Sequence, residues 1–469
     1  MGKWIYLIKS GIVTGLISLL LYFTLKHIIY EQRTAILKEV QKSLTFIRPM
    51  QSGNESFYKW IYIGDPDLRH QQYSAYFDPR VETLNSADFD EENKSYGTIR
   101  TFAILPLDID DDEIVCIYKF DDNETMTVTP GEVNAITEHE DLEFAAFTIM
   151  CPLINVNNSK IVDLPYSIAL SYESNMLTVE QPAFIPITYP VASNILRYNY
   201  KYLAVCVFPL PVHYRNVLRI AEFIELYKLL GSEKFYFYII KATDDVHKLL
   251  DYYVEKDVVE KMDWNFYRGL NQSEVKYANI LAYYNDCMYR GTFKDGFKHL
   301  AMVGIDEIIM PLQQNTLTEY VETLEDRYRS TSFIFDTVFF HQNYGLDRFN
   351  IPPNFNNKFL YSQVKIERSE TPMPIRNRYI VVGSTAVEAG NHQIWRALYG
   401  FTTSGKVTSE EAVIFNYRTQ CLFLICEASS TIDFTARRYG SLLWYSVENV
   451  CNLVFSDSGG VCQIRSKFT

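Results

Sequence analysis

The 469-residue chain carries 57 acidic and 44 basic side chains, so its formal net charge is −13. Proteins bind nucleic acid through a basic surface, and this charge balance therefore argues against a nucleic-acid partner. Tyrosine and phenylalanine are abundant, which excludes a disordered chain. The length is sufficient for two or three domains, each with its own apolar core.

An uncharged apolar segment lies near the amino terminus, at residues 10–25. With the residues just before it, the apolar span extends over 4–25, close to the ~20 residues that a bilayer requires. No small-x-small cleavage site follows, so we expect an uncleaved signal anchor, with a cleaved signal peptide as the alternative. This pattern predicts a cytoplasmic tail at 1–9, a transmembrane helix at 10–25 and a polar stem at 26–55.

The residues after this segment are expected to lie in the lumen of the ER or Golgi. Basic residues flank both ends of the segment, so the positive-inside rule does not set the orientation. The expectation of a single-pass type II protein is supported by five glycosylation sequons, at Asn54, Asn93, Asn123, Asn157 and Asn271. The eight cysteines contain no C-x-x-C pair, which argues against a zinc ribbon. They are compatible with disulfides in any pairing, and buried free thiols are the alternative.

Short apolar runs separated by turn residues occupy residues 56–197. Examples are the runs at 98–105, 113–120 and 143–149. This pattern predicts an all-β, sandwich-like domain. It contains no recognisable catalytic constellation.

Strand and helix patterns alternate over residues 198–430. Strands are expected at 202–208, 235–240, 258–264 and 300–303, and helices at 215–230, 244–255 and 273–290. Further apolar runs at 333–340, 379–382 and 412–415 extend this sheet or form a second one, and 431–469 is a C-terminal extension with a helix at 442–454. The alternation predicts a mostly parallel, Rossmann-like sheet with helices on both faces, which binds ligands at the carboxyl ends of its strands.

Local signals refine the ends and faces of these helices. Gly231 is expected to end the first helix, Asp244 or Asp245 to cap the second, and Ser273 to cap the third. Along the first helix, charged residues recur at every third position and form a stripe of the kind seen on amphipathic helices: Arg219, Glu222, Glu225 and Lys228.

Two adjacent carboxylates, Asp306 and Glu307, follow the apolar strand at 300–303. Carboxylates at this position can hold Mg²⁺ or Mn²⁺, which neutralises charge on a departing diphosphate. Asp306 is the natural first ligand, whereas Glu307 points the other way unless a turn intervenes. The alternative is a simple polar end to a buried strand. Gly304 stands where sugar-nucleotide enzymes usually have a second aspartate.

Two other positions are candidates for the same chemistry. His392, in the turn Gly390-Asn-His392, could supply an imidazole ligand, although a loop histidine is commonly just solvent-exposed. Asp286 and Arg290 lie four residues apart on one expected helix. They are either an ordinary ion pair or an arginine directed at phosphate and oriented by the aspartate.

Six segments of the chain are similar, in order, to segments of glycosyltransferase family 92. They are Tyr73–Arg80, Val205–Pro209 with the helix up to Gly231, Asn285–Arg290, Gly304–Pro311, Arg378–Val382 with Gly390–His392, and Asn416–Arg418. The resemblance covers about residues 70–420. Two positions depart from the family pattern: Gly304 replaces an aspartate and Asn416 replaces a histidine.

The resemblance implies a Golgi-type type II membrane protein with a GT-A catalytic domain after a β-rich domain. It also implies an inverting, Mn²⁺-dependent transferase that uses a UDP-sugar donor, with galactose as the sugar, and a glycan acceptor. Carried onto this chain, Asp306 and His392 are the metal ligands. The residues implied beside the nucleotide sugar are Cys206, Asp286, Arg290, Gly304 and Glu307.

An inverting transferase needs a carboxylate base for the acceptor hydroxyl. Asp336, within the apolar run 333–340, and Glu388 are the two candidates. Because Gly304 removes an expected contact, a catalytically inactive glycan-binding or scaffold protein remains an alternative. A metal-dependent nucleotide-sugar hydrolase on the same sheet is another, and a homodimer is left open.

Overall fold

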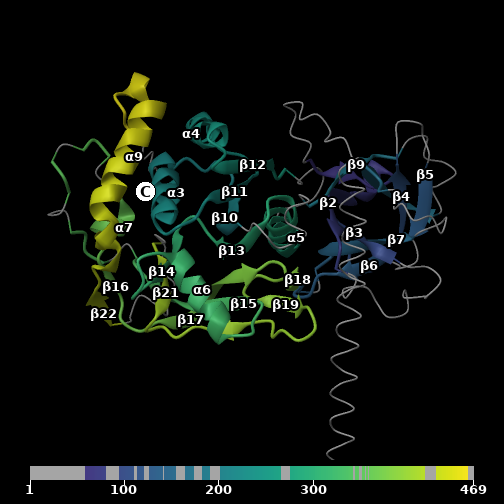
Figure 1. The fold of residues 1–469 in the computed structure, drawn as a ribbon. Helices are drawn as coiled ribbons and strands as arrows, with labels where there is room; N and C mark the ends of the chain where they lie inside the picture. The colour runs from purple at the N-terminus through teal and green to yellow at the C-terminus, as the bar shows by residue number, and fades with distance from the viewer. Residues whose placement is uncertain are drawn as a thin grey trace, which may run out of the picture.

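The structure is a computed structural model that describes part of the chain. The described residues are 59–80, 95–109, 114–120, 126–140, 142–154, 164–173, 182–190, 201–265, 275–341, 344–347, 351–353, 355–357, 359–417 and 429–462. They form a β-rich domain (59–190) and an α/β domain (201–462), each built around a nine-stranded sheet (Figure 1).

The sheet of the β-rich domain has the strand order β5-β4-β8-β9-β2-β3-β7-β6, with β1 paired to β2. Its elements are β1 (Ile61–Tyr62), η1 (Pro66–Leu68), β2 (Gln71–Asp78), β3 (Ser95–Pro106), β4 (Ile114–Lys119), β5 (Met126–Pro130), β6 (Glu132–Ala135), β7 (Phe144–Ile154), β8 (Ser167–Tyr172) and β9 (Ile185–Thr188). The pairs are antiparallel except β2 with β9. The predicted all-β character of this region is confirmed.

This sheet encloses an apolar core between its two halves. Ile99 in β3 and Phe147 in β7 share that core with Cys116 in β4 and Ile168 in β8. A disulfide from Cys116 to Cys151 joins β4 to β7, which are not neighbours in the sheet. The arrangement is sandwich-like, as the turn-separated apolar runs predict.

The sheet of the α/β domain has the order β12-β11-β10-β13-β17-β15-β21-β14, with β20 paired to β15. Its strands are β10 (Lys201–Leu210), β11 (Lys234–Ile239), β12 (Val259–Asp263), β13 (Phe297–Val303), β14 (Glu307–Pro311), β15 (Ser332–Phe339), β17 (Met373–Val382), β20 (Gly405–Lys406) and β21 (Ala412–Asn416). The strands β12, β11, β10 and β13 are mutually parallel, as predicted, whereas β17 and β14 run antiparallel to their neighbours. Two small pairs lie outside the main sheet: β16 (Glu367–Ser369) with β22 (Ser430–Ile432), and β18 (Ala386–Ala389) with β19 (Ile394–Ala397).

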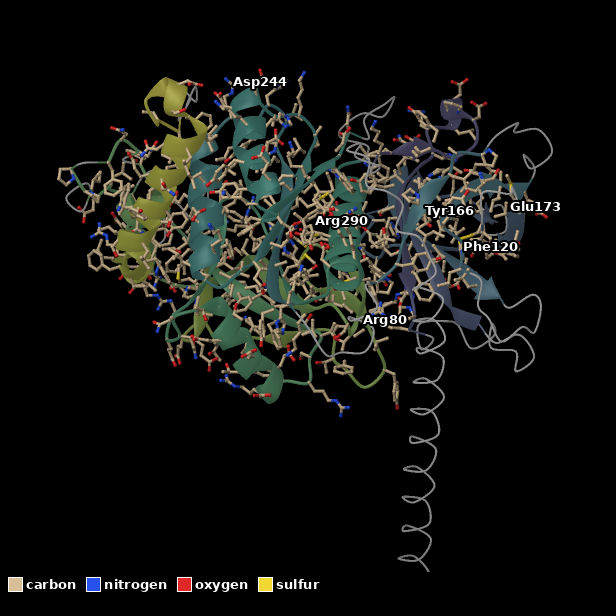
Figure 2. All side chains as sticks on the ribbon, turned by 45° about the horizontal axis from the view of Figure 1, so that its top comes forward. Arg80, Phe120, Tyr166, Glu173, Asp244 and Arg290 are labelled. Atoms are coloured by element: carbon tan, nitrogen blue, oxygen red, sulfur yellow. A yellow bond between two sulfur atoms is a disulfide. The ribbon has the colours of Figure 1, made fainter. Side chains whose placement is uncertain are left out.

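Helices cover both faces of this sheet. They are α3 (Val217–Leu229), α4 (Asp244–Glu255), α5 (Lys276–Tyr289), η6 (Arg290–Lys294), α6 (Leu317–Arg327), α7 (Tyr361–Val364), η7 (Thr435–Tyr439), α9 (Gly440–Val454) and η8 (Ser456–Ser458). Residues of α3, α4, α6 and α9 share one apolar core with the sheet, whereas α5 shares a second core with the opposite face and with the β-rich domain. Accordingly, α5 lies between the two sheets (Figure 1). Arg290, at its end, lies deep within the molecule (Figure 2).

The predicted helix ends are partly confirmed. Gly231 follows α3 with φ +97°, a conformation that glycine adopts without strain. The helix α4 has the predicted bounds, but its N-cap is Thr243 rather than Asp244 or Asp245. Ser273, the predicted cap of the third helix, lies outside the described residues.

The charged stripe on α3 is not a solvated face. Arg219, Glu222 and Glu225 are only 2%, 1% and 4% exposed, because α4, α9 and the segment around α7 pack on this side of the helix. The side chain of Lys228, the fourth residue of the stripe, is 39% exposed. The carboxylate of Glu222 accepts hydrogen bonds from the backbone N–H groups of Tyr361 and Ser362, at the start of α7. The spacing of charged residues along a helix predicts which face they share, but it does not show whether other elements pack on that face.

Several predictions concern residues that the structure does not describe. The apolar span at 10–25, the stem and all five sequons lie outside the described residues. Within the described part of the chain, no helix is long and apolar enough to cross a membrane.

The six cysteines in the described ranges form three disulfides. Besides Cys116–Cys151, a disulfide joins Cys206 in β10 to Cys287 in α5, and another joins Cys451 to Cys462. The alternative of buried free thiols is therefore wrong for these six cysteines.

Candidate functional site

The two carboxylates after β13 are separated by a turn. The N–H of Glu307 donates to the carbonyl of Gly304 at 3.0 Å, so Ile305 and Asp306 form the turn and Glu307 begins β14. The side chain of Asp306 is 40% exposed at the carboxyl edge of the parallel strands. Its backbone carbonyl accepts from Tyr417 N at 2.8 Å, which anchors the turn without using the carboxylate. Asp306 therefore faces outward, as predicted for a ligand-binding position.

Glu307 has a structural role, which corrects its assignment beside the nucleotide sugar. Its carboxylate is buried and accepts from Arg378 Nε at 2.6 Å, Gly304 N at 2.7 Å and Asn416 Nδ2 at 3.3 Å. These bonds tie β14 to β17 and β21 below the turn. Asn416, one of the two departures from the family pattern, is thus a donor to this buried carboxylate.

Gly304 is not required for its backbone freedom. It is absent from the described residues that have positive φ. A Cβ atom there would lie 3.1 Å from Oε2 of Glu307, close but within reach of a small adjustment. The backbone N–H of Gly304 donates to the buried Glu307 carboxylate. Because glycine has no side chain, this position offers a ligand no carboxylate of its own.

His392 lies at the same edge of the sheet, in the turn between β18 and β19. Its Nδ1 is 3.0 Å from the carbonyl of Asn377, and because a carbonyl only accepts, Nδ1 carries the proton. Nε2 is then the acceptor, and Asn391 Nδ2 lies 3.1 Å from it. Arg378, which binds Glu307, lies 3.5 Å from Nδ1 through Nη1. The chain thus brings His392 next to the strand ends that carry Asp306.

Arg219 is the residue that sequence reasoning missed. Its Nε lies 3.5 Å from Oδ1 of Asp306, and its Nη1 donates to Glu222 at 3.0 Å. The guanidinium lies 5.2 Å and 5.1 Å from the ring centroids of Tyr361 and Tyr417. The only signal in the sequence was its charge on α3, which periodicity assigned to the helix surface.

A second buried cation belongs to the same neighbourhood. Lys365, just after α7, donates through Nζ to the carbonyl of Phe340 at 3.2 Å and is 7% exposed. Burial, and then the positive charge of Arg219, lower the pKa of Lys365 to about 8. Burial and the nearby carboxylate of Asp306 raise the pKa of Tyr214 well above its usual value. Buried charges and shifted pKa values that gather around one exposed carboxylate are typical of functional sites.

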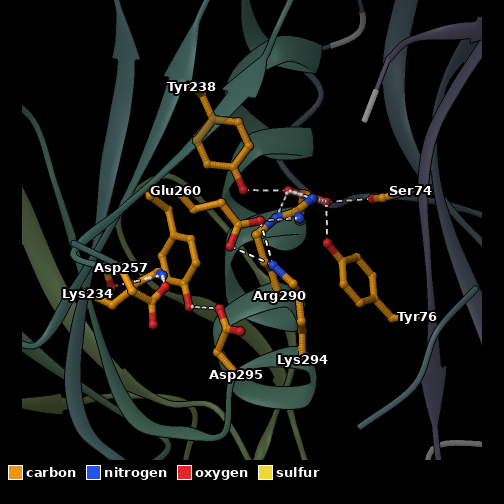
Figure 3. A network of polar contacts seen from close by, with 11 residues as sticks. Ser74, Tyr76, Lys234, Tyr238, Asp257, Glu260, Arg290, Lys294 and Asp295 are labelled. Carbon is orange, nitrogen blue, oxygen red and sulfur yellow. Dashed lines mark hydrogen bonds and ion pairs between the residues drawn. The ribbon is translucent and has the colours of Figure 1, made fainter. Parts of the chain in front are cut away.

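Cys206, Asp286 and Arg290 do not lie at this site, which corrects three assignments. Cys206 is fully buried in its disulfide with Cys287. Asp286 and Arg290 are also fully buried, and they form the ion pair that was the alternative reading, at 3.1 Å. Arg290 donates in addition to Glu260 at 3.1 Å, within the network in Figure 3.

The carboxylate of Asp286 joins the two domains. Ser74 and Tyr76, on β2 of the β-rich domain, donate to its Oδ1 at 2.5 Å and 2.7 Å. Tyr238, on β11, donates to its Oδ2 (Figure 3). The motif segments at 73–80 and 285–290 therefore meet in space, but as an interdomain contact and not as a nucleotide site.

The two candidate bases differ. The carboxylate of Glu388 is fully engaged: Oε1 accepts from Thr137 N at 3.0 Å and Oε2 pairs with Arg396 Nε at 3.1 Å. This arrangement is inconsistent with a base that faces an acceptor. In Asp336, Oδ2 contacts Ser409 at 3.0 Å and Lys406 at 3.3 Å, while Oδ1 is buried with no hydrogen-bond partner among the described residues. Asp336 stays a prediction.

The described residues contain no preformed group of three His, Cys, Asp or Glu side chains suited to a metal ion. The donor atoms of Asp306 and His392 nevertheless fit Mn²⁺, which accepts carboxylate and imidazole. With the proton of His392 on Nδ1 and directed at the carbonyl of Asn377, Nε2 would be the ligating atom. A metal ion would then take the lone pair of Nε2 to which the side-chain amide of Asn391 now donates. Phosphate oxygens of a substrate commonly complete such a site.

The model of glycosyltransferase family 92 matches residues 201–442, more than half of the chain. The chain belongs to glycosyltransferase family 92. The match begins at β10 and ends at the start of α9, so it covers the sheet that carries Asp306, and the β-rich domain precedes it. The match therefore places the α/β domain in a family of glycosyltransferases.

One similar protein is "Beta-1,4-galactosyltransferase galt-1" of Caenorhabditis elegans. It is 28% identical over 198 residues, which cover 40% of this family 92 chain and 43% of the relative. The alignment thus spans less than half of either protein.

Proposed function

We propose that this transferase moves galactose from UDP-galactose to a hydroxyl group of a glycan, with inversion at the anomeric carbon. The observation that carries the proposal is the half-exposed Asp306 carboxylate at the carboxyl edge of the parallel strands, beside the buried Arg219. The choice of galactose is supported by the name of the similar C. elegans protein. The proposed fold type of the α/β domain is GT-A, supported by its order of parallel strands and the position of Asp306 after the fourth of them.

We further propose Mn²⁺ as the cofactor, held by Asp306 and His392. When bound, the ion would neutralise charge that develops on the leaving diphosphate. Arg219 and Lys365 could neutralise the same charge, because both are buried cations: Arg219 pairs with Asp306, and the charge of Asp306 also acts on Lys365. A buried cation without a full set of partners is costly, and an anionic ligand would offset that cost. Nη2 of Arg219 has no hydrogen-bond partner among the described residues, and Nε lies at the ion-pair distance of 3.5 Å from Asp306.

The protein is proposed to be a type II membrane protein of the ER or Golgi. Three disulfides among the described cysteines support an oxidising compartment. The sequons and the apolar segment at 10–25 support the same location.

Calorimetry with UDP tests the nucleotide part of this proposal. Full-length protein is expected to bind UDP with Mn²⁺ present and markedly more weakly with EDTA. No binding in either condition would favour the inactive glycan-binding alternative. An acceptor array incubated with several UDP-sugars would then identify donor and acceptor, and rapid release of free sugar without an acceptor would favour the hydrolase.

Gly304→Asp tests whether the missing aspartate limits metal binding. The backbone at this position accepts an L-residue, and the new Cβ needs only a small shift of Glu307. We therefore expect a folded protein with unchanged or higher Mn²⁺ affinity, measured by calorimetry, and with an unchanged Tm. Gly304→Ala is the control for the added Cβ alone. A folded Gly304→Asp protein with weaker Mn²⁺ binding than Gly304→Ala would contradict this expectation.

A further inference from the structure

The β-rich domain is fastened to the hairpin β18–β19 of the α/β domain. Asp78, at the end of β2, is fully buried between Arg80 and Arg100, each 2.8 Å away. Although burial opposes it, these two guanidinium groups lower the pKa of Asp78 to about 2. Arg80 also donates to the carbonyl of Ala386, the first residue of β18, at 2.6 Å. One end of the hairpin is thus fixed by the β-rich domain.

The other end of the hairpin is held by the loop that follows β6. Oε2 of Glu138 accepts from the backbone N–H of Asn391 at 3.0 Å and from Nε1 of Trp395 at 3.1 Å. The neighbouring Thr137 donates its N–H to Glu388 at 3.0 Å. Three hairpin residues on both sides of the His392 turn therefore contact two residues of the other domain.

The backbone at Glu138 and at Gly390 has features that the contact between the loop after β6 and the His392 turn requires. Glu138 has φ +79°, an uncommon conformation for a residue other than glycine and one that persists only where its surroundings fix it. A Cβ at Gly390 would lie 2.8 Å from Oε2 of Glu138 and 2.2 Å from Nε1 of Trp395. Only glycine at position 390 lets the carboxylate and the indole meet at the turn.

We propose that Glu138 is a positioning residue through which the β-rich domain sets the turn that carries His392. The carboxylate fixes the backbone of Asn391, which directly precedes His392 in the turn. The side-chain amide of Asn391 lies 3.1 Å from Nε2 of His392, the atom that a metal ion would take. Tyr284 on α5 donates to the amide oxygen of Asn391 at 3.3 Å and holds the same side chain from the other side. The β-rich domain is therefore part of the catalytic assembly rather than a spacer. The inference rests on the proposed function only in the role of His392 as a metal ligand.

Hydrogen–deuterium exchange of the metal-free, full-length protein tests whether Glu138 fixes the His392 turn. Glu138→Ala is expected to speed exchange at residues 386–397 while the strands of both main sheets keep their protection. Glu140→Ala is the matched control, because Glu140 lies in the same loop, also has positive φ (+53°) and is exposed. It should match the unaltered protein. Trp395→Phe removes one of the two donors and should give an intermediate effect.

Kinetics test the consequence for the metal. Glu138→Ala should raise the Mn²⁺ concentration for half-maximal activity, by less than the roughly 10–100-fold that loss of a direct partner of a metal ligand causes. The effect should be smaller because Glu138 acts on His392 only through the backbone of Asn391. The KM for the acceptor should stay unchanged. Unaltered exchange at 386–397 in Glu138→Ala would overturn the inference whatever the activity. Faster exchange throughout both main sheets, in Glu138→Ala and in the milder Glu138→Gln, would also overturn the inference. Glu138 would then stabilise the whole fold and not the His392 turn in particular. If exchange at 386–397 speeds up in Glu138→Ala but the unaltered protein has no transferase activity, the proposed function fails. The positioning role of Glu138 is then still supported.

Discussion

Asp306→Asn is expected to lower transferase activity by on the order of 100-fold or more and to leave the fold intact. The substitution keeps the shape of the side chain and removes the charge that would hold Mn²⁺. The fold should survive because the Asp306 carbonyl and buried Glu307 anchor the turn, and because asparagine keeps an oxygen that can face Arg219. Arg219 keeps its ion pair with Glu222. Activity on the identified donor and acceptor, Mn²⁺ binding by calorimetry and Tm are the three measurements.

Asp326→Asn is the matched control for this experiment. Asp326 is an exposed aspartate on α6, distant from the turn along the chain, and its substitution should change neither activity nor Mn²⁺ binding. If Asp306→Asn retained most activity, Asp306 would not be a metal ligand. If it lost activity but bound Mn²⁺ normally, the carboxylate would act on the substrate and not on the ion.

The sequence predicts the main elements because each has a strong local signal. Uninterrupted apolar runs become the buried strands β10, β11 and β13, and the 3.6-residue period gives α3 and α4 within two residues of their ends. The outward position of Asp306 follows from the same logic, since a polar pair directly after a buried strand must lie at the edge of the sheet. These inferences depend only on neighbours along the chain.

The partners of buried charges could not be predicted in this way. Arg219 and Glu222 have the spacing of a solvated stripe, and only the tertiary packing of α7 and α9 buries them. Glu307 differs from Asp306 by one position, yet the turn sends it inward to Arg378, which lies 71 residues away. Glu138 carries no sequence signal at all, because its partners Asn391 and Trp395 belong to another domain.

The resemblance to family motifs also did not distinguish residues that contact a substrate from residues that hold the two domains together. The segments that contain Ser74 with Tyr76, and Asp286 with Arg290, both resemble family segments, although only the second lies within the matched residues 201–442. In space they form one buried contact between domains. Fully buried side chains with every strong partner inside the protein cannot contact a nucleotide, so their role is to fix the β-rich domain against α5. That attachment is what lets Glu138 reach the His392 turn.

Asp286→Ala is therefore expected to destabilise the protein by about 3–5 kcal/mol without a specific effect on UDP binding. The change removes one carboxylate that pairs with buried Arg290 and leaves another, that of Glu260. It also removes the acceptor of three hydroxyl groups, those of Ser74, Tyr76 and Tyr238 (Figure 3). Each buried donor that loses its acceptor adds to the cost. Thermal unfolding followed by circular dichroism should show a lower Tm, and calorimetry on the folded protein at low temperature should give an unchanged Kd for UDP with Mn²⁺.

Asp295→Ala is the control for Asp286→Ala, since Asp295 accepts from Tyr236 at 2.6 Å in the same network but is partly exposed. Water can replace the lost acceptor there, so the fall in Tm should be much smaller. Asp286→Asn keeps one acceptor oxygen and should lie between the two. The opposite result, an unchanged Tm for Asp286→Ala with a weaker Kd for UDP, would place Asp286 at the nucleotide. It would also require a rearrangement of α5 against β2, because the present arrangement gives the carboxylate no exposed surface.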